Sequence, residues 1–139
     1  MLRKITSLLM LFVLAAAPAF ATPTALTVLT LKQNNYAVVG GDLALSYTAC
    51  DNVNGNSFVA TGQEILLVQN ADGAASHTFT VTSVADQLGR TDSSLTGYSL
   101  AQSTFAVVQM RQVTGWAVGN IVSLACNSAQ IKFAVIRFQ

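Results

Sequence analysis

The chain of 139 residues has few charged side chains, one histidine, two cysteines and two prolines. Charged residues make up 9% of the sequence, against about 25% in an ordinary soluble domain. Beyond a predicted leader that holds Arg3 and Lys4, five basic residues face six acidic ones. Such a near-neutral chain offers no electrostatic attraction to a phosphate backbone or an anionic lipid surface. The sequence therefore argues against nucleic acid and membrane surfaces as partners.

The small number of histidine and cysteine residues also leaves few candidates for catalytic groups. His77 could form a serine triad with Asp86 or Asp92, but no Gly-x-Ser-x-Gly segment supplies the nucleophile. A zinc site around His77 would have no recognisable ligand spacing. We expect neither enzymatic activity nor a cofactor.

Residues 51–56 are rich in side-chain oxygens, as calcium loops are. An EF-hand is excluded because Val53 stands at its third position and Gly62 at its twelfth, where oxygen ligands are required. A looser calcium site made by Asp51, Asn54 and Asn56 is the alternative to a turn in which these side chains bind the local backbone.

The amino terminus has the order of a secretory signal. Arg3 and Lys4 precede the apolar run Leu8–Ala17, which is followed by the small-residue ending Ala19-Phe20-Ala21. The run is too short to span a bilayer comfortably. We expect residues 1–21 to be cleaved and the mature protein to be secreted, with no membrane in its mature form and a cell or virion surface as its possible location; an uncleaved anchor is the alternative.

Short β-branched and apolar runs alternate with turn residues, and no amphipathic helix is evident. This pattern predicts an all-β fold, an antiparallel β-sandwich of jelly-roll type with about eight strands. The predicted strands are 26–32, 42–49, 64–70, 77–84, 94–100, 104–111, 121–126 and 130–138. Turns are expected at 34–35, 40–41, 54–56, 71–73, 89–90, 115 and 119–120. An amino-terminal strand or arm, 22–32, precedes a sandwich domain, 33–139.

Side-chain alternation predicts which strand faces are wet. In 77–84, Phe79 and Val81 share one face while the threonines share the other, so one side of that strand meets water. Three runs, 65–68, 105–108 and 133–136, are instead apolar on both faces. A two-layer sandwich covers only one face of each sheet, so a loop, the arm or a neighbouring subunit must supply the second cover.

Cys50 and Cys126 each close a predicted strand, and a pair of cysteines in an exported chain favours a disulfide. Two buried thiols or an intersubunit bond are the alternatives. In a separate loop, Arg90 is expected to form a salt bridge with Asp86 or Asp92.

Trp116 is the only tryptophan and lies between Gly115 and Gly119. It could plug the end of the sandwich, anchor a subunit interface or, with nearby tyrosines, stack on a sugar.

Four segments carry a family resemblance: 54–58 (Asn-Gly-Asn-Ser-Phe), 61–70 (Thr-Gly-Gln-Glu-Ile-Leu-Leu-Val-Gln-Asn), 89–92 (Gly-Arg-Thr-Asp) and 134–137 (Ala-Val-Ile-Arg). Together they resemble the small β-sandwich structural proteins of tailed bacteriophages, of the head-decoration type. The resemblance implies a non-enzymatic protein that coats or cements a larger assembly. Such virion proteins have no export signal and need no disulfide, so here the resemblance implies the fold and the assembly role on an exported chain.

We therefore expect a structural subunit that binds copies of itself in a coat, decoration layer, capsid lattice or filament. The alternative is a monomeric secreted binding module, with carbohydrate as its ligand. The arm could add a strand to a neighbour's sheet. The predicted interface residues are Leu26, Val28, Leu29, Leu31, Trp116, Phe133 and Phe138.

Overall fold

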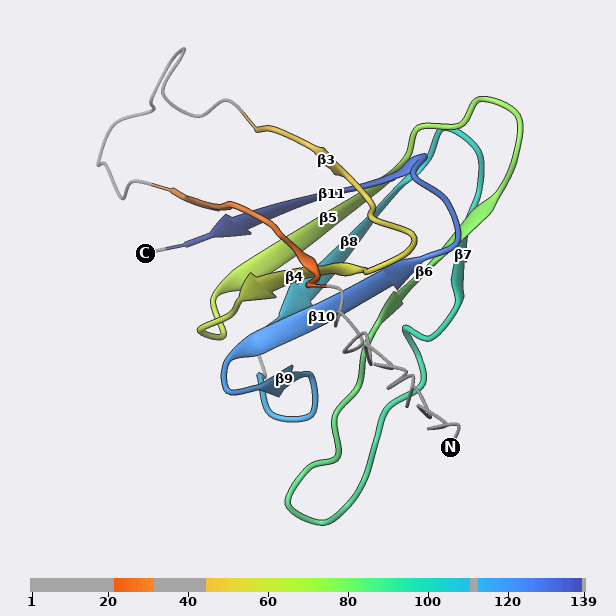
Figure 1. The fold of residues 1–139 in the computed structure, drawn as a ribbon. Coiled ribbons are helices and arrows are strands. Elements are labelled where there is room, and N and C mark those ends of the chain that lie inside the picture. The colour runs from red at the N-terminus through yellow and green to blue at the C-terminus, as the bar shows by residue number, and fades with distance from the viewer. Residues whose placement is uncertain (1–21, 32–44, 111–112, 139) are drawn as a thin grey trace, which may run out of the picture.

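The computed structural model describes residues 22–31, 45–110 and 113–138. These residues form eleven strands in two sheets that pack against each other (Figure 1), which confirms the predicted all-β sandwich. The predicted leader, the turns at 34–35 and 40–41, and the first part of the predicted strand 42–49 lie outside the described residues. In the part of the chain that is described, no helix is long and apolar enough to cross a membrane.

The first sheet has the strand order β1-β4-β10-β6-β7, with β9 beside β10. Its strands are β1 (Thr24–Ala25), β4 (Asn56–Val59), β10 (Ile121–Cys126), β6 (His77–Val81), β7 (Tyr98–Leu100) and β9 (Ala117–Val118).

The second sheet has the order β2-β11-β5-β8, with β3 also beside β11. Its strands are β2 (Val28–Thr30), β11 (Ile131–Arg137), β5 (Glu64–Asn70), β8 (Phe105–Met110) and β3 (Thr48–Ala49). In Figure 1 β4, β10 and β6 lie in front of β11, β5 and β8.

The core lies between the two sheets. Every second side chain of β5, β10 and β11 points into it, as the two-residue period of a strand requires. The largest fully buried apolar side chains are Phe79, Phe133, Leu66, Leu124 and Ile131. The ring centroids of Phe79 and Phe133 are 6.5 Å apart in an edge-to-face arrangement, which joins the two layers.

The amino-terminal arm crosses from one sheet to the other. The arm 22–32 holds two strands: β2, which lies within the predicted strand 26–32 and pairs with β11, and β1, which precedes that predicted strand and pairs with β4. Both pairs are parallel, whereas the remaining strand pairs are antiparallel. Leu26 stands at the crossing point, and its side chain fills the core with 8% exposure.

A disulfide joins Cys50 and Cys126, as predicted, with their Cα atoms 6.4 Å apart. Cys50 directly follows β3 in the second sheet, and Cys126 ends β10 in the first. The bond therefore ties the two layers of the sandwich together.

The other predicted strands agree unevenly with the structure. The bounds of 64–70 and 121–126 match β5 and β10, and 77–84, 104–111 and 130–138 contain β6, β8 and β11. The predicted strand 94–100 is wrong in its first half, because residues 94–97 form a turn in which the Thr96 N–H donates to Ser93 O. Strands β4 and β9 were not predicted.

Two buried polar side chains fix the turns around β5. The Glu64 carboxylate accepts hydrogen bonds from three successive N–H groups (Thr61, Gly62 and Gln63), from the Thr61 hydroxyl and, at 2.5 Å, from Arg137 Nε. Asn70 Nδ2 donates to the carbonyls of Ala75, Leu100 and Ala101. These two side chains thus supply hydrogen-bond partners to loop N–H and C=O groups and hold the loops against the core.

Candidate functional site

The outward side of the first sheet is mostly polar. Ser57 lies opposite Ser123 on neighbouring strands, and Thr80 lies opposite Ala125. Thr78 and Thr80 are half-buried, whereas Phe79 and Val81 point into the core as predicted. Only the end of this side is apolar, where exposed Val59, Val118 and Ile121 lie on paired strands.

The centre of the outward side of the second sheet is apolar, from β2 to β8. The register places Leu29, Ile136 and Ile65 in one row across β2, β11 and β5. Ala134, Leu67 and Val107 form the next row, which continues onto β8. With Phe105 these side chains form what we call the outer apolar face: Leu29, Ile65, Leu67, Phe105, Val107, Ala134 and Ile136.

Exposure is greatest on the β8 side of the outer apolar face. Phe105 is 60% exposed and Val107 is 66% exposed, although both are large apolar residues. Tyr47 lies over part of the face, with its ring centroid 6.4 Å from that of Phe105. The second cover that the doubly apolar runs require is therefore incomplete within the described part of this single chain.

Polar side chains mark the border of this face. Gln109 lies opposite Ile65, and Lys132 and Gln69 are paired in the row that ends at Phe105. An apolar centre with a polar rim is the usual composition of a protein–protein interface.

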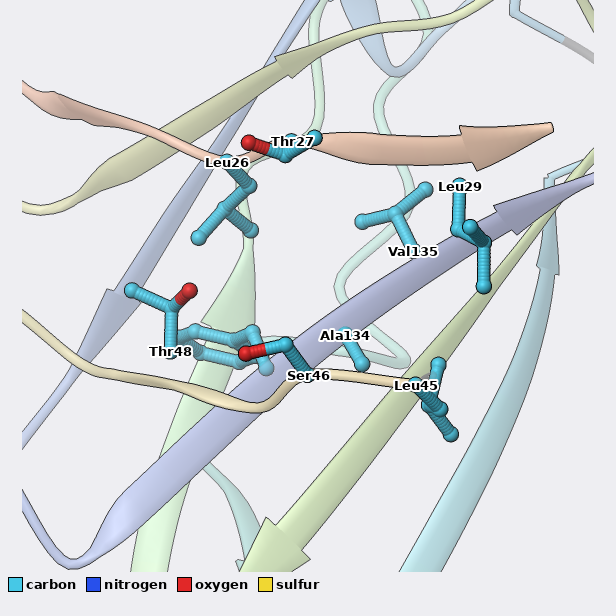
Figure 2. Close-up of a pocket in the computed structure, with 9 residues that line it drawn as sticks. Leu26, Thr27, Leu29, Leu45, Ser46, Thr48, Ala134 and Val135 are labelled. Atoms are coloured by element: carbon cyan, nitrogen blue, oxygen red, sulfur yellow. The ribbon is translucent and has the colours of Figure 1, made fainter. Parts of the chain in front are cut away.

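A groove adjoins the outer apolar face where β2 and β3 both approach β11 (Figure 2). The groove has a volume of about 130 Å³ and is lined by Leu26, Thr27, Leu29, Leu45, Ser46, Thr48, Phe133, Ala134 and Val135. It is close in size to cavities of ~150 Å³ that accept a benzene-sized group. Leu29 and Ala134 belong to both the groove and the outer apolar face, so the two form one continuous apolar surface.

The predicted interface residues are divided between the core and the surface. Phe133 is 0% exposed and Leu26 is nearly so, so neither offers surface to a neighbour in this chain. Val28 and Trp116 pack partly against the core, Leu29 and Leu31 are half-buried, and Phe138 is 47% exposed. Of the seven residues, only Leu29 belongs to the outer apolar face.

The prediction did not include Ile65, Leu67, Phe105 or Val107 among the interface residues. The sequence does indicate these residues, because they lie in the runs 65–68 and 105–108, which are apolar on both faces. Composition alone does not say whether the odd-numbered or the even-numbered residues of each run point into the core. The pairing register of β5 with β8 decides this, and places Leu66 in the core and Leu67 outside.

The β6–β7 connection extends well beyond the sheets (Figure 1) and contains the predicted salt bridge. Arg90 Nη2 lies 2.7 Å from Asp86 Oδ2, while Asp92 accepts a hydrogen bond from the Ser94 N–H. The Arg90 N–H in the first place, then its side chain, lowers the pKa of Asp86. The Ser94 N–H likewise lowers the pKa of Asp92.

This connection and the loop after β8 enclose a cleft of about 200 Å³, which we call the end cleft. It is lined by Ser83, Asp86, Arg90, Thr91, Asp92, Thr114, Gly115 and Trp116. Trp116 therefore has one side against the core and another at the cleft. The tyrosines lie elsewhere: Tyr47 directly precedes β3 and packs against Phe105, Tyr98 begins β7 and packs against Phe79, and Tyr36 is outside the described residues.

His77 and the oxygen-rich segment 51–56 hold local structure. His77 Nε2 lies 2.8 Å from Asp72 Oδ2, next to a turn in which Asp72 Oδ1 accepts the N–H groups of Ala74 and Ala75. The Ala74 N–H is the main group that lowers the pKa of Asp72.

Asp51 accepts hydrogen bonds from the N–H groups of Val53 and Asn54, and its own N–H donates to Asn56 Oδ1. The Asn54 N–H is the first cause of the lowered pKa of Asp51. The segment thus forms the Asx turn that was the alternative to a calcium site. Across residues 22–31, 45–110 and 113–138, no three His, Cys, Asp or Glu side chains are grouped as metal ligands.

Comparison with protein-family models, with curated proteins and with solved structures finds no match to this chain.

Proposed function

We propose that this chain is a non-enzymatic structural subunit that is exported and assembles with copies of itself into a coat, decoration layer or filament on a cell or virion surface. The observation that carries the proposal is the outer apolar face. Large apolar side chains that lie together on an exposed sheet face, within a polar rim, are typical of an interaction surface.

Two further features support assembly with copies of the same chain. The near-neutral charge weakens the repulsion that keeps ordinary domains apart in solution. The disulfide suits an oxidising compartment and stabilises a subunit that must persist outside the cell. The resemblance to head-decoration proteins implies the same role.

The experiment compares two double variants by light scattering and electron microscopy. Ile65→Thr with Leu67→Thr removes two apolar side chains from the centre of the outer apolar face and keeps the high strand propensity of the residues it introduces. The matched control, Val59→Thr with Ile121→Thr, removes two exposed apolar side chains from the first sheet. We expect the unaltered protein and the control to form large assemblies, and the outer-face variant to form only small species.

A single copy at every concentration of the unaltered protein would contradict the proposal. Loss of assembly in the control alone would place the interface on the first sheet instead. Circular dichroism of each variant shows whether it is folded.

A second candidate function is saccharide binding in the end cleft. It is favoured by Trp116, which lines the cleft together with charged and hydroxyl side chains such as Arg90 and Thr91. The test is binding to a glycan array, with Trp116→Leu and Arg90→Ala as variants. Saturable binding that both variants lose, by a protein that stays monomeric, would favour this function over assembly.

A further inference from the structure

β8 is the longest open edge among the strands that the structure describes. Within residues 22–31, 45–110 and 113–138, it pairs with β5 on one side and with no strand on the other. The other edge strands β1, β2, β3, β7 and β9 have two or three residues each, whereas β8 has six. Natural sheets usually shorten an edge, bend it or place charged residues or proline on it, because an open edge pairs with other chains.

β8 has none of these protections apart from its polar residue Gln109. Its sequence Phe-Ala-Val-Val-Gln-Met contains no charged residue and no proline. The strand pairs with β5 residue by residue from Phe105 to Met110, without a bulge.

The hydrogen-bond pattern shows which backbone groups are free at this edge. The Asn70 N–H points towards β8, because it donates to Thr104 O at 3.0 Å, and the Ala71 N–H points the other way, to Gln130 O. In an antiparallel pair, hydrogen-bonded and non-hydrogen-bonded positions alternate. Ala106 and Val108 therefore bond to β5, while the N–H and C=O groups of Phe105, Val107 and Gln109 point away from the sheet.

We infer that β8 pairs antiparallel with the β8 of a second copy about a twofold axis at Val107. This inference rests on the proposed function and names the edge through which subunits first join. In this register Val107 lies opposite Val107 of the second copy, and Phe105 lies opposite its Gln109. The outward backbone groups of each strand then meet those of the other.

A second copy fits this edge better than other occupants. A strand without charges brings no like-charge repulsion to its own symmetry mate and offers no charge to recruit an acidic or basic segment. A six-residue edge is matched in length by another β8, whereas the other described edges of the chain would leave half or more of it unpaired. The pairing also makes the two second sheets continuous, and this places the two outer apolar faces on the same side.

A cysteine cross-link tests the register. Cα atoms of a hydrogen-bonded antiparallel pair are ~5.5 Å apart, which is within the range of a disulfide. The two copies of residue 107 therefore meet this distance, while the two copies of residue 109 are separated along the strands by four residues. We expect Val107→Cys to form a covalent dimer on mild oxidation and Gln109→Cys, the matched control on the same edge, to remain largely uncross-linked.

A backbone variant tests the hydrogen bonds themselves. Val107→Pro removes an N–H that points away from β5, so the ladder within the chain is retained. Val107→Thr is its control, because it keeps the N–H. We expect the proline variant to raise the dimer dissociation constant about tenfold or more, and the threonine variant to change it much less.

The outcomes separate this inference from the proposed function. The outer-face variant Ile65→Thr with Leu67→Thr should still dimerise although it no longer forms large assemblies. Assembly of the unaltered protein with equal cross-linking at residues 107 and 109, or with an undiminished dimer in the folded proline variant, overturns the β8 pairing alone. A protein that stays a single copy throughout overturns both and leaves β8 free for a strand of a different partner.

Discussion

At the scale of single residues, Glu64 is a buried carboxylate that accepts hydrogen bonds from the turn 61–63 and from Arg137. Burial by itself would raise the pKa of the Glu64 carboxyl. Hydrogen bonds from Thr61, Arg137 and Gly62 outweigh burial and lower the pKa from 4.5 to about 2. The ionised form is therefore the one that stabilises the fold.

This difference in pKa predicts a dependence of stability on pH. The contribution of Glu64 is fully present above pH 4.5 and is lost as the pH falls towards about 2. It corresponds to roughly 3 kcal/mol of the free energy of unfolding. We expect Glu64→Gln to be less stable than the unaltered protein by about this amount at neutral pH, and the gap to close as the pH approaches 2. Urea unfolding of both proteins over this pH range measures the gap, and a gap that stays constant would contradict the role of the ionised carboxylate.

At the scale of the elements, the disulfide is a covalent link between the two sheets, from the end of β3 to the end of β10. It closes a loop with a sequence separation of 76 residues. On the chain-entropy description, a loop of this size contributes about 4 to 5 kcal/mol by restricting the unfolded chain.

We therefore expect the double variant Cys50→Ala with Cys126→Ala to lose about 4 to 5 kcal/mol of its free energy of unfolding. Guanidinium unfolding of the variant and of the unaltered protein measures the difference. Unfolding of the unaltered protein under reducing conditions should give a similar loss and serves as the control for the substitutions. An unchanged midpoint in both would mean that the bond restricts little of the unfolded chain.

The strands that were predictable are those whose side chains follow a simple pattern. β5 and β10 are long runs bounded by turn residues, and their bounds were found. β4 was missed because a polar residue, Asn56, occupies a core position and hides the two-residue period. β9 has two residues and carries no period, and the split of the arm depends on Leu26 crossing between layers, which local sequence does not encode.

At the scale of the whole molecule, the two outward sides have opposite character. The first sheet presents mainly serine and threonine to water, and the second presents the outer apolar face. The sequence predicted that apolar surface would be left over, but not where. Its location follows from the pairing of β5 with β8 and β11, which puts Ile65, Leu67 and Val107 on one side.

The low charge predicts how association responds to salt. Interactions that depend on apolar burial and backbone hydrogen bonds are little affected by screening. We expect the association constant to change little when sodium chloride is raised, and to increase in sulfate, which favours apolar burial. Sedimentation at several salt concentrations measures this. A steep fall in affinity with sodium chloride would indicate that the few charged residues make the contacts.

Because one outward sheet face carries hydroxyl groups and the other is apolar, each single subunit is already amphipathic. Two copies joined side by side at β8 keep the same orientation, so the pair has one polar surface and one apolar surface. Such a pair would orient itself at a boundary between water and an oily or gaseous phase.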